Sequence, residues 1–153
     1  MTVQVSSTVL PLFLAAGWHP GRKVPLPDGL DCVGLKGHPA LSALESFAGL
    51  RVGSCGAGVD CAKSDLEFEW MEDDYSAHIV PWESSLATRL IGIAWVHHRH
   101  GALYVASDGR CFSLSTVSDD FYFDGPDFAV ASERLLLGHG SQRRHLRNGS
   151  PNG

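Results

Sequence analysis

The sequence predicts a single domain of the α+β class, in which an antiparallel β-meander sheet packs against helices from the N-terminal and C-terminal parts of the chain. Apolar residues recur with helical spacing near both ends, and short apolar segments follow one another between residues 91 and 114. Tight-turn sequences separate these short segments. The length of 153 residues suits one domain with its own core. We expect residues 1–138 to form this domain and residues 139–153 to form a disordered polar tail.

Two helices are expected before the sheet begins. The first spans about residues 8–16, because its apolar residues have the i, i+3, i+4 spacing of one buried stripe. The second starts at Pro39, a favoured first helical position, and ends at Gly49. The residues expected to face the core are Leu10, Phe13 and Leu14 in the first helix, and Leu41, Leu44, Phe47 and Ala48 in the second.

A sharp turn follows the first helix. Gly17 can adopt the left-handed conformation that ends a helix, and Pro20 prevents the helix from restarting at once. Trp18 is a large anchor between them, and Arg22 places a permanent charge just after the bend. The segment contains no nucleophile, general base or metal-ligand set, so we expect it to have a structural role.

The middle of the chain predicts strands at residues 50–52, 66–70, 91–97, 102–106 and 110–114. Glu67 and Glu69 alternate with apolar residues and are expected to face water. Two tight turns, at residues 99–101 and 108–109, connect the later strands. A short helix is expected at residues 82–90. A last helix starts near Asp127, ends at Gly138 and buries Phe128, Ala131, Leu135 and Leu136.

The charge of the chain is acidic, with 17 Asp and Glu residues, 12 Lys and Arg residues and a net charge of −5. Three of these bases, Arg143, Arg144 and Arg147, lie in the expected tail, which leaves a body of −8. Such a surface repels nucleic acid and suits a basic partner. The apolar stretch at residues 9–17 is too short to cross a membrane and has no preceding basic cluster, so we expect a cytoplasmic protein.

Four cysteines are present without a Cys-x-x-Cys pair, and in a cytoplasmic protein we expect them to be free thiols. His98 and His100 can share one side of a strand, and with Cys111 they form a conceivable three-ligand metal site. The alternative is a polar hairpin end. Because no fourth ligand has suitable spacing, we predict no metal, no cofactor and no catalytic residue, and a small metal-dependent enzyme remains an alternative.

Acidic and aromatic residues are interleaved in two parts of the sequence. Residues 60–83 contain eight acids and one base, with Trp70, Tyr75 and Trp82 interleaved, and the acids at positions 119–127 surround three consecutive aromatic residues. Such clusters form either a solvated face or a surface that receives Lys and Arg side chains from a partner. The partner-binding residues predicted on the second interpretation are Glu67, Glu69, Glu72, Asp73, Asp74, Tyr75, Asp119, Asp120 and Tyr122.

Four segments together resemble the SUKH superfamily of bacterial immunity proteins, in particular its third subgroup. They are the Gly-Trp-His-Pro-Gly-Arg turn at residues 17–22, the helix end and strand at residues 44–52, the hairpin at residues 103–112, and the Leu-rich helix that ends at Gly138. The resemblance spans about residues 10–138. Ala48 stands where the family has the first glycine of a Gly-Gly pair.

The resemblance implies a cytosolic antidote that binds and neutralises a cognate protein toxin domain, often a nuclease or a nucleic-acid deaminase, without catalysis. It assigns a fold-determining role to Gly17, Trp18, Gly21, Arg22, Gly49 and Gly109. A non-immunity interaction scaffold on the same fold is the alternative. The toxin, the face that binds it and the oligomeric state are left open by the sequence.

Overall fold

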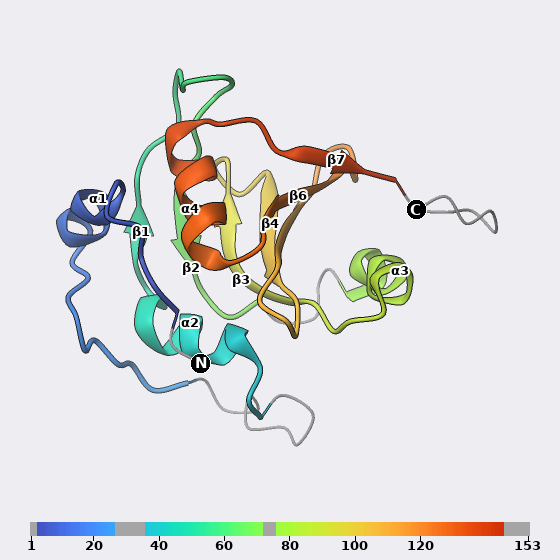
Figure 1. The fold of residues 1–153 in the computed structure, drawn as a ribbon, viewed down its shortest axis with the longest axis horizontal. Helices are drawn as coiled ribbons and strands as arrows, with labels where there is room; N and C mark the ends of the chain where they lie inside the picture. Colours follow the sequence, from blue (N-terminus) through green and yellow to red (C-terminus); the bar gives the residue numbers. More distant parts are fainter. Residues whose placement is uncertain (1–2, 27–35, 72–75, 146–153) are drawn as a thin grey trace.

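The computed structural model describes residues 3–26, 36–71 and 76–145, and Figure 1 shows their arrangement. Seven strands form one antiparallel sheet in which spatial order follows sequence order, so the predicted meander is confirmed. The strands are β1 (Arg51–Val52), β2 (Leu66–Phe68), β3 (Ile91–Val96), β4 (Gly101–Val105), β5 (Cys111–Ser115), β6 (Phe121–Gly125) and β7 (Gln142–Arg144).

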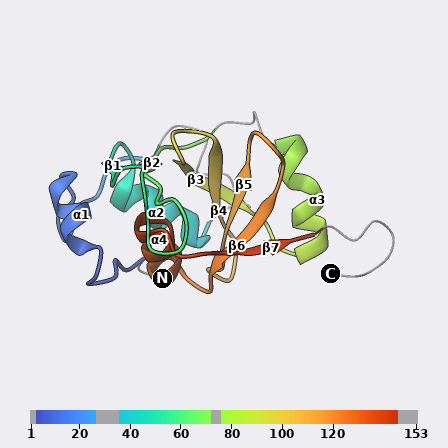
Figure 2. The ribbon, with the colours of Figure 1, turned by 90° about the horizontal axis from the view of Figure 1, so that it is seen from above.

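Helices cover both faces of this sheet. They are α1 (Leu10–Ala15), α2 (Pro39–Phe47), α3 (Ser76–Leu86) and α4 (Phe128–Leu137). The helices α1, α2 and α4 pack on one face, whereas α3 packs on the other (Figures 1 and 2). The predicted α+β class, with N-terminal and C-terminal helices against the sheet, is confirmed. The third helix differs from the prediction, because it begins at Ser76 rather than Trp82 and contains Pro81 in its interior.

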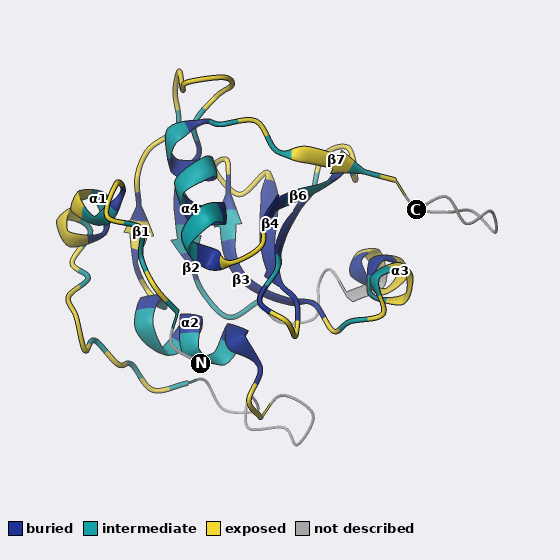
Figure 3. Cartoon of the chain, viewed as in Figure 1, coloured by how far each residue is buried: buried dark blue, intermediate teal, exposed yellow. Residues whose placement is uncertain are grey.

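Strand alternation creates two separate apolar cores. In β4, Leu103 and Val105 point into the core beneath α2 and α4, whereas Ala102 and Tyr104 point into the core beneath α3. Both sets are buried, which is why β4 is an almost continuous apolar run rather than an alternating one (Figure 3).

The larger core is built around four phenylalanine rings, one each from α1, α2, β2 and α4. All six pairs of rings have centroids within 6.3 Å, and the rings of Phe47 and Phe128 are stacked at 5.0 Å. We call Phe13, Phe47, Phe68 and Phe128 the Phe cluster. In α1, only Phe13 of the predicted stripe is fully buried, and Leu14 is 48% exposed because this six-residue helix turns it away from the core.

The smaller core holds α3 against the sheet. The ring of Trp82 stacks on Phe121 with centroids 4.1 Å apart, and Phe121 stacks on Phe112 at 5.2 Å. Strand β6, which supplies Phe121, was not predicted. Residues 121–123 are all aromatic, so they lack the alternation of polar and apolar residues that marks a half-buried strand.

The expected disordered tail is wrong for residues 142–144, which form β7 and pair with β6. An edge strand offers free backbone N–H and C=O groups, and these accept a neighbouring strand whatever its side chains. The polar composition of Gln142–Arg144 therefore did not prevent pairing. Residues 146–153 of the expected tail lie outside the described residues.

The turn after α1 has the structural role that the sequence predicts. The indole N–H of Trp18 donates to Ser46 Oγ at 2.9 Å. Arg22 donates to the carbonyl oxygens of Ser46 at 2.7 Å and Ala48 at 2.9 Å. These carbonyls lie at the C-terminal end of α2, where a cation also interacts favourably with the helix dipole.

Helix α4 matches its predicted ends. Asp127 caps its N-terminus through a hydrogen bond from Val130 N at 2.9 Å. Gly138 ends it with φ of +76°, and its N–H donates to the carbonyl of Arg134.

Replacing Arg22 with alanine should lower the free energy of unfolding by about 2 to 3 kcal/mol, because two part-buried carbonyls lose a charged donor. Urea denaturation measures this change. Lys23→Ala is the neighbouring control and should change stability by no more than about 0.5 kcal/mol, since Lys23 is 76% exposed and its ion pair with Glu45 lies at the surface. Equal effects of the two substitutions would contradict the capping role of Arg22.

Candidate partner-binding surfaces

The first candidate surface lies beside β2 on the α3 side of the sheet. Arg99 Nη1 lies 2.8 Å from Glu67 Oε1 and 2.9 Å from Glu69 Oε1. The guanidinium also lies 4.8 Å from the ring centroid of Trp95, whose indole N–H donates to Glu69. We call Glu67, Glu69, Trp95 and Arg99 the Arg99 cluster. Both carboxylates therefore already have a cation of the protein's own.

The second candidate surface is the turn between β5 and β6. Asp119 lies 3.5 Å from Nδ1 of His78 on α3, and Asp120 pairs with Arg143 of β7. Ser118 Oγ donates to Asp120 at 2.9 Å. The acids of this turn are thus connected to neighbouring elements on both sides.

The structure does not bring the predicted partner-binding residues together on one face. Glu67 is the register partner of Trp95, on the side of the sheet that faces α3. Tyr122 is the register partner of Ser113 and points to the opposite side, where both line a hollow beside α4. Glu72, Asp73, Asp74 and Tyr75 lie outside the described residues.

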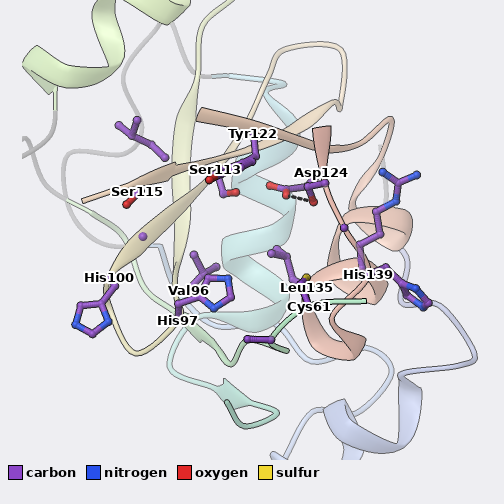
Figure 4. Close-up of a pocket in the computed structure, with 16 residues that line it drawn as sticks. Cys61, Val96, His97, His100, Ser113, Ser115, Tyr122, Asp124, Leu135 and His139 are labelled. Atoms are coloured by element: carbon purple, nitrogen blue, oxygen red, sulfur yellow. Dashed lines mark hydrogen bonds between the residues drawn. The ribbon is translucent and has the colours of Figure 1, made fainter. Parts of the chain in front are cut away.

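The hollow on the α4 side has a volume of about 460 Å³. Figure 4 shows that Asp124, Ser113 and Tyr122 border one part of it, Val96 and two histidines another, and Leu135 and Cys61 a third. Its walls therefore combine apolar side chains with a few converging polar groups, as in sites that hold a small ligand or a partner side chain.

Asp124 is the most unusual group of the hollow. It is 1% exposed, and its Oδ1 accepts a hydrogen bond from Ser141 Oγ at 2.7 Å. Its Oδ2 has no hydrogen-bond partner among the described residues. Burial raises the pKa of Asp124 to about 6, although the hydroxyls of Ser141 and Ser113 and the charge of Arg134 act to lower it. The hollow thus contains a buried acceptor for which the described residues supply no donor.

The structure does not bring together His98, His100 and Cys111, the metal site that the sequence suggested. His100 directly precedes Gly101 at the start of β4, whereas Cys111 pairs with Val105 at the far end of that strand. Cys111 is fully buried and donates to the carbonyl of Gly109, and burial raises the pKa of its thiol. His98 instead lies near Cys55 and Asp65. Of the four cysteines, Cys55, Cys61 and Cys111 are free thiols, and Cys32 lies outside the described residues.

The family model of the SUKH-3 immunity proteins matches residues 5–138, which include α1 to α4 and β1 to β6. The chain belongs to the SUKH-3 immunity protein family. A search of curated proteins and of solved structures found no match. The motif Trp18 to Arg22, the α2 end and the β4–β5 hairpin all fall within the matched range of this SUKH-3 protein. Families of immunity proteins are generally non-enzymatic.

None of the helices within the described parts of the SUKH-3 chain has the length and apolar content that a bilayer span requires.

Asp124→Asn should make stability depend less on pH between about 4 and 6. Because the folded pKa of Asp124 is raised, the wild type binds more protons folded than unfolded in this window, and its stability falls as pH rises. For a shift from 3.8 to about 6, the wild type should lose roughly 2 kcal/mol of stability between pH 4 and pH 7, and Asp124→Asn should not show this loss. Urea denaturation across pH 4 to 7 measures it.

Ser141→Ala is the matched variant for this experiment. It removes the hydrogen bond that favours the ionised form, so the loss of stability above pH 6 should grow. Parallel stability–pH curves for the wild type and Asp124→Asn would contradict the perturbed environment of Asp124.

Proposed function

We propose that this protein is a cytosolic, non-catalytic immunity protein that binds a cognate toxin domain of a polymorphic toxin and blocks the toxin's basic surface. The toxin is proposed to be a nuclease or a nucleic-acid deaminase. Membership of the SUKH-3 family, over nearly the whole folded chain, is the observation that carries this proposal. A protein of this kind needs no cofactor or metal to act, because occlusion of the toxin is sufficient.

The charge of the domain supports a basic partner. Arg143 and Arg144 belong to β7 and therefore to the folded body, which corrects the charge of −8 expected from the sequence. Residues 1–145 contain 17 acids and 11 bases, a net charge of −6. This excess still attracts a basic toxin and accelerates its association at low ionic strength.

The α3 side is the proposed toxin-facing side. There, Glu67 and Glu69 are 36% and 44% exposed, and Trp95 adds an aromatic surface beside them. Because Arg99 is half exposed, an incoming Lys or Arg of the toxin can replace it as the partner of these carboxylates. The acids at positions 72–74 and Tyr75 follow Glu69 directly in the sequence, and we include them in the same interface.

The β5–β6 turn is proposed as the edge of this interface. Asp119 contacts His78 of α3 on the proposed toxin-facing side, whereas Asp120 pairs with Arg143 of β7 and Tyr122 lines the hollow. A toxin that touches all the predicted residues must therefore wrap around this turn. The alternative function, an interaction scaffold without a toxin, uses the same surfaces and differs only in the partner.

Growth rescue tests the proposed function. A toxin domain encoded beside this gene is expressed in a sensitive bacterial strain, with and without the protein. We expect the wild-type protein to restore growth and to form a complex with the purified toxin. Failure of both rescue and complex formation would favour the scaffold.

Charge reversal tests the toxin-facing side. The variant Glu72→Lys/Asp73→Lys/Asp74→Lys and the variant Glu67→Lys/Glu69→Lys should each slow toxin association by at least about tenfold at low salt and weaken its salt dependence. Stopped-flow kinetics at several salt concentrations measure this effect.

The matched control for the double variant is Glu45→Lys/Asp108→Lys, which changes net charge equally at two acids, 32% and 57% exposed, away from the Arg99 cluster. Its association rate should change much less. If the double variant and its control slow association equally, only net charge matters and the α3 side is not the interface.

A further inference from the structure

Three side chains with metal-binding atoms converge where the β1–β2 loop meets the β3–β4 turn. The Sγ of Cys55, the carboxylate of Asp65 and Nδ1 of His98 all lie within 4.8 Å of one another. Cys55 Sγ is 3.6 Å from Asp65 Oδ1, and His98 Nδ1 is 3.6 Å from Asp65 Oδ2. This group is separate from the Arg99 cluster and from the hollow.

The backbone holds these three groups in place. Asp65 is 1% exposed and accepts a hydrogen bond from the backbone N–H of His98 at 3.0 Å. Its neighbour Ser64 accepts one from the N–H of His97 at 2.7 Å. The loop that carries Cys55 is closed by the bridge between Gly56 and Lys63.

The β3–β4 turn itself is held in a strained conformation. His97, His98 and Arg99 have φ values of +50°, +53° and +69°, a left-handed run that non-glycine residues rarely adopt. The hydrogen bonds from Ser64 and Asp65 keep this turn in place. The position of His98 relative to Asp65 is therefore built into the fold.

The spacing of the three atoms suits a tetrahedral zinc ion. Zinc binds cysteine sulfur at about 2.3 Å and histidine nitrogen or carboxylate oxygen at about 2.0 to 2.2 Å, which places neighbouring ligand atoms roughly 3.3 to 3.6 Å apart. The 3.6 Å distances from Cys55 Sγ to Asp65 Oδ1 and from His98 Nδ1 to Asp65 Oδ2 are close to this range, and all three ligand atoms lie within 4.8 Å of one another. A set of one thiolate, one imidazole and one carboxylate favours zinc over calcium or magnesium, which prefer oxygen ligands alone.

The guanidinium of Arg51 already lies beside Asp65 and His98. Arg51 Nη2 lies 3.2 Å from Asp65 Oδ2 and 3.2 Å from His98 Nδ1. Because a guanidinium can only donate, this contact requires the lone pair on Nδ1, which is the form that a metal needs. Although burial acts to raise the pKa of Asp65, hydrogen bonds from the His98 N–H and the Cys55 thiol, together with the charge of Arg51, lower it overall.

We propose that Cys55, Asp65 and His98 bind one zinc ion, with water as the fourth ligand and Arg51 turned out to solvent. Arg51 can make this movement because its side chain is 59% exposed. Binding replaces the thiol proton of Cys55, so one proton is released for each zinc ion bound. The ion would link the β1–β2 loop to the β3–β4 turn, and its binding does not depend on the toxin proposal.

Cobalt titration of the purified, untagged full-length protein tests this site. We expect one Co²⁺ per chain, with the near-ultraviolet absorption of a cobalt–thiolate bond and the intense visible bands of tetrahedral cobalt. Zinc should displace the cobalt and abolish both signals, and a pH indicator should record one proton released per ion.

Two variants test proposed ligands, a third is a control, and a fourth tests the competing cation. Cys55→Ser should abolish the cobalt–thiolate absorption, and His98→Asn should weaken metal affinity by at least about tenfold. Cys61→Ser is the control, since Cys61 is exposed and lies outside the group of three, and it should bind as the wild type does. Arg51→Gln should bind more tightly, because it removes the competing cation.

Circular dichroism of each metal-free variant shows whether it is folded, so that a loss of binding is not mistaken for unfolding. Absence of the thiolate band in the folded wild type would overturn the proposal. A band that survives Cys55→Ser, or metal binding that depends on His100 rather than His98, would also overturn it.

Discussion

The Phe cluster is the interaction on which the rest of the structure depends. Its four rings come from α1, α2, β2 and α4, and every pair is in contact. Aromatic pairs of this kind contribute about 0.5 to 1.5 kcal/mol each beyond the burial of their area. Because α1 and α4 lie at opposite ends of the domain sequence, this contact closes the chain. It also fixes α4, which forms one wall of the hollow through Arg134 and Leu135.

Strand alternation then decides which surfaces a partner meets. Neighbouring residues of one strand point to opposite faces, and both faces of this sheet are covered by helices. Residues predicted to bind the same partner therefore separate in space when their side chains point to opposite faces of the sheet, as those of Glu67 and Tyr122 do. An acidic composition is a property of the chain, whereas an acidic face is a property of the fold. An acidic composition therefore does not ensure that the acids share one face.

The sequence predicts the parts of the fold that local chemistry determines. Pro39, Asp127 and Gly138 mark helix ends that the structure reproduces, and the Asp108-Gly109 turn lies in the predicted hairpin. The sequence does not predict strands whose formation depends on tertiary contacts. Strand β6 directs Phe121 and Phe123 into the core beneath α3 and Tyr122 toward the hollow, and β7 forms because an edge strand accepts it.

Sequence patterns also do not predict the candidate sites, because the contacts in these sites join residues that are far apart in the chain. Arg99 is 32 positions from Glu67, and His98 is 33 positions from Asp65. The sequence identifies His98 as a metal-ligand candidate but pairs it with Cys111, since strand adjacency is visible in the sequence. The sequence does not show that the Gly-rich loop that carries Cys55 approaches His98, because this contact depends on the pairing of β2 with β3.

Two buried carboxylates show how differently the fold treats the same side chain. Asp65 receives donors from His98, Cys55 and Arg51, and its pKa is lowered despite burial. Asp124 has Ser141 as a donor to one oxygen, the other oxygen has no partner among the described residues, and burial raises its pKa to about 6.

Any partner on the α3 side must compete with Arg99 for acids that are already paired. At the hollow, a partner group that donates a hydrogen bond to Asp124 would relieve a cost that the isolated domain carries.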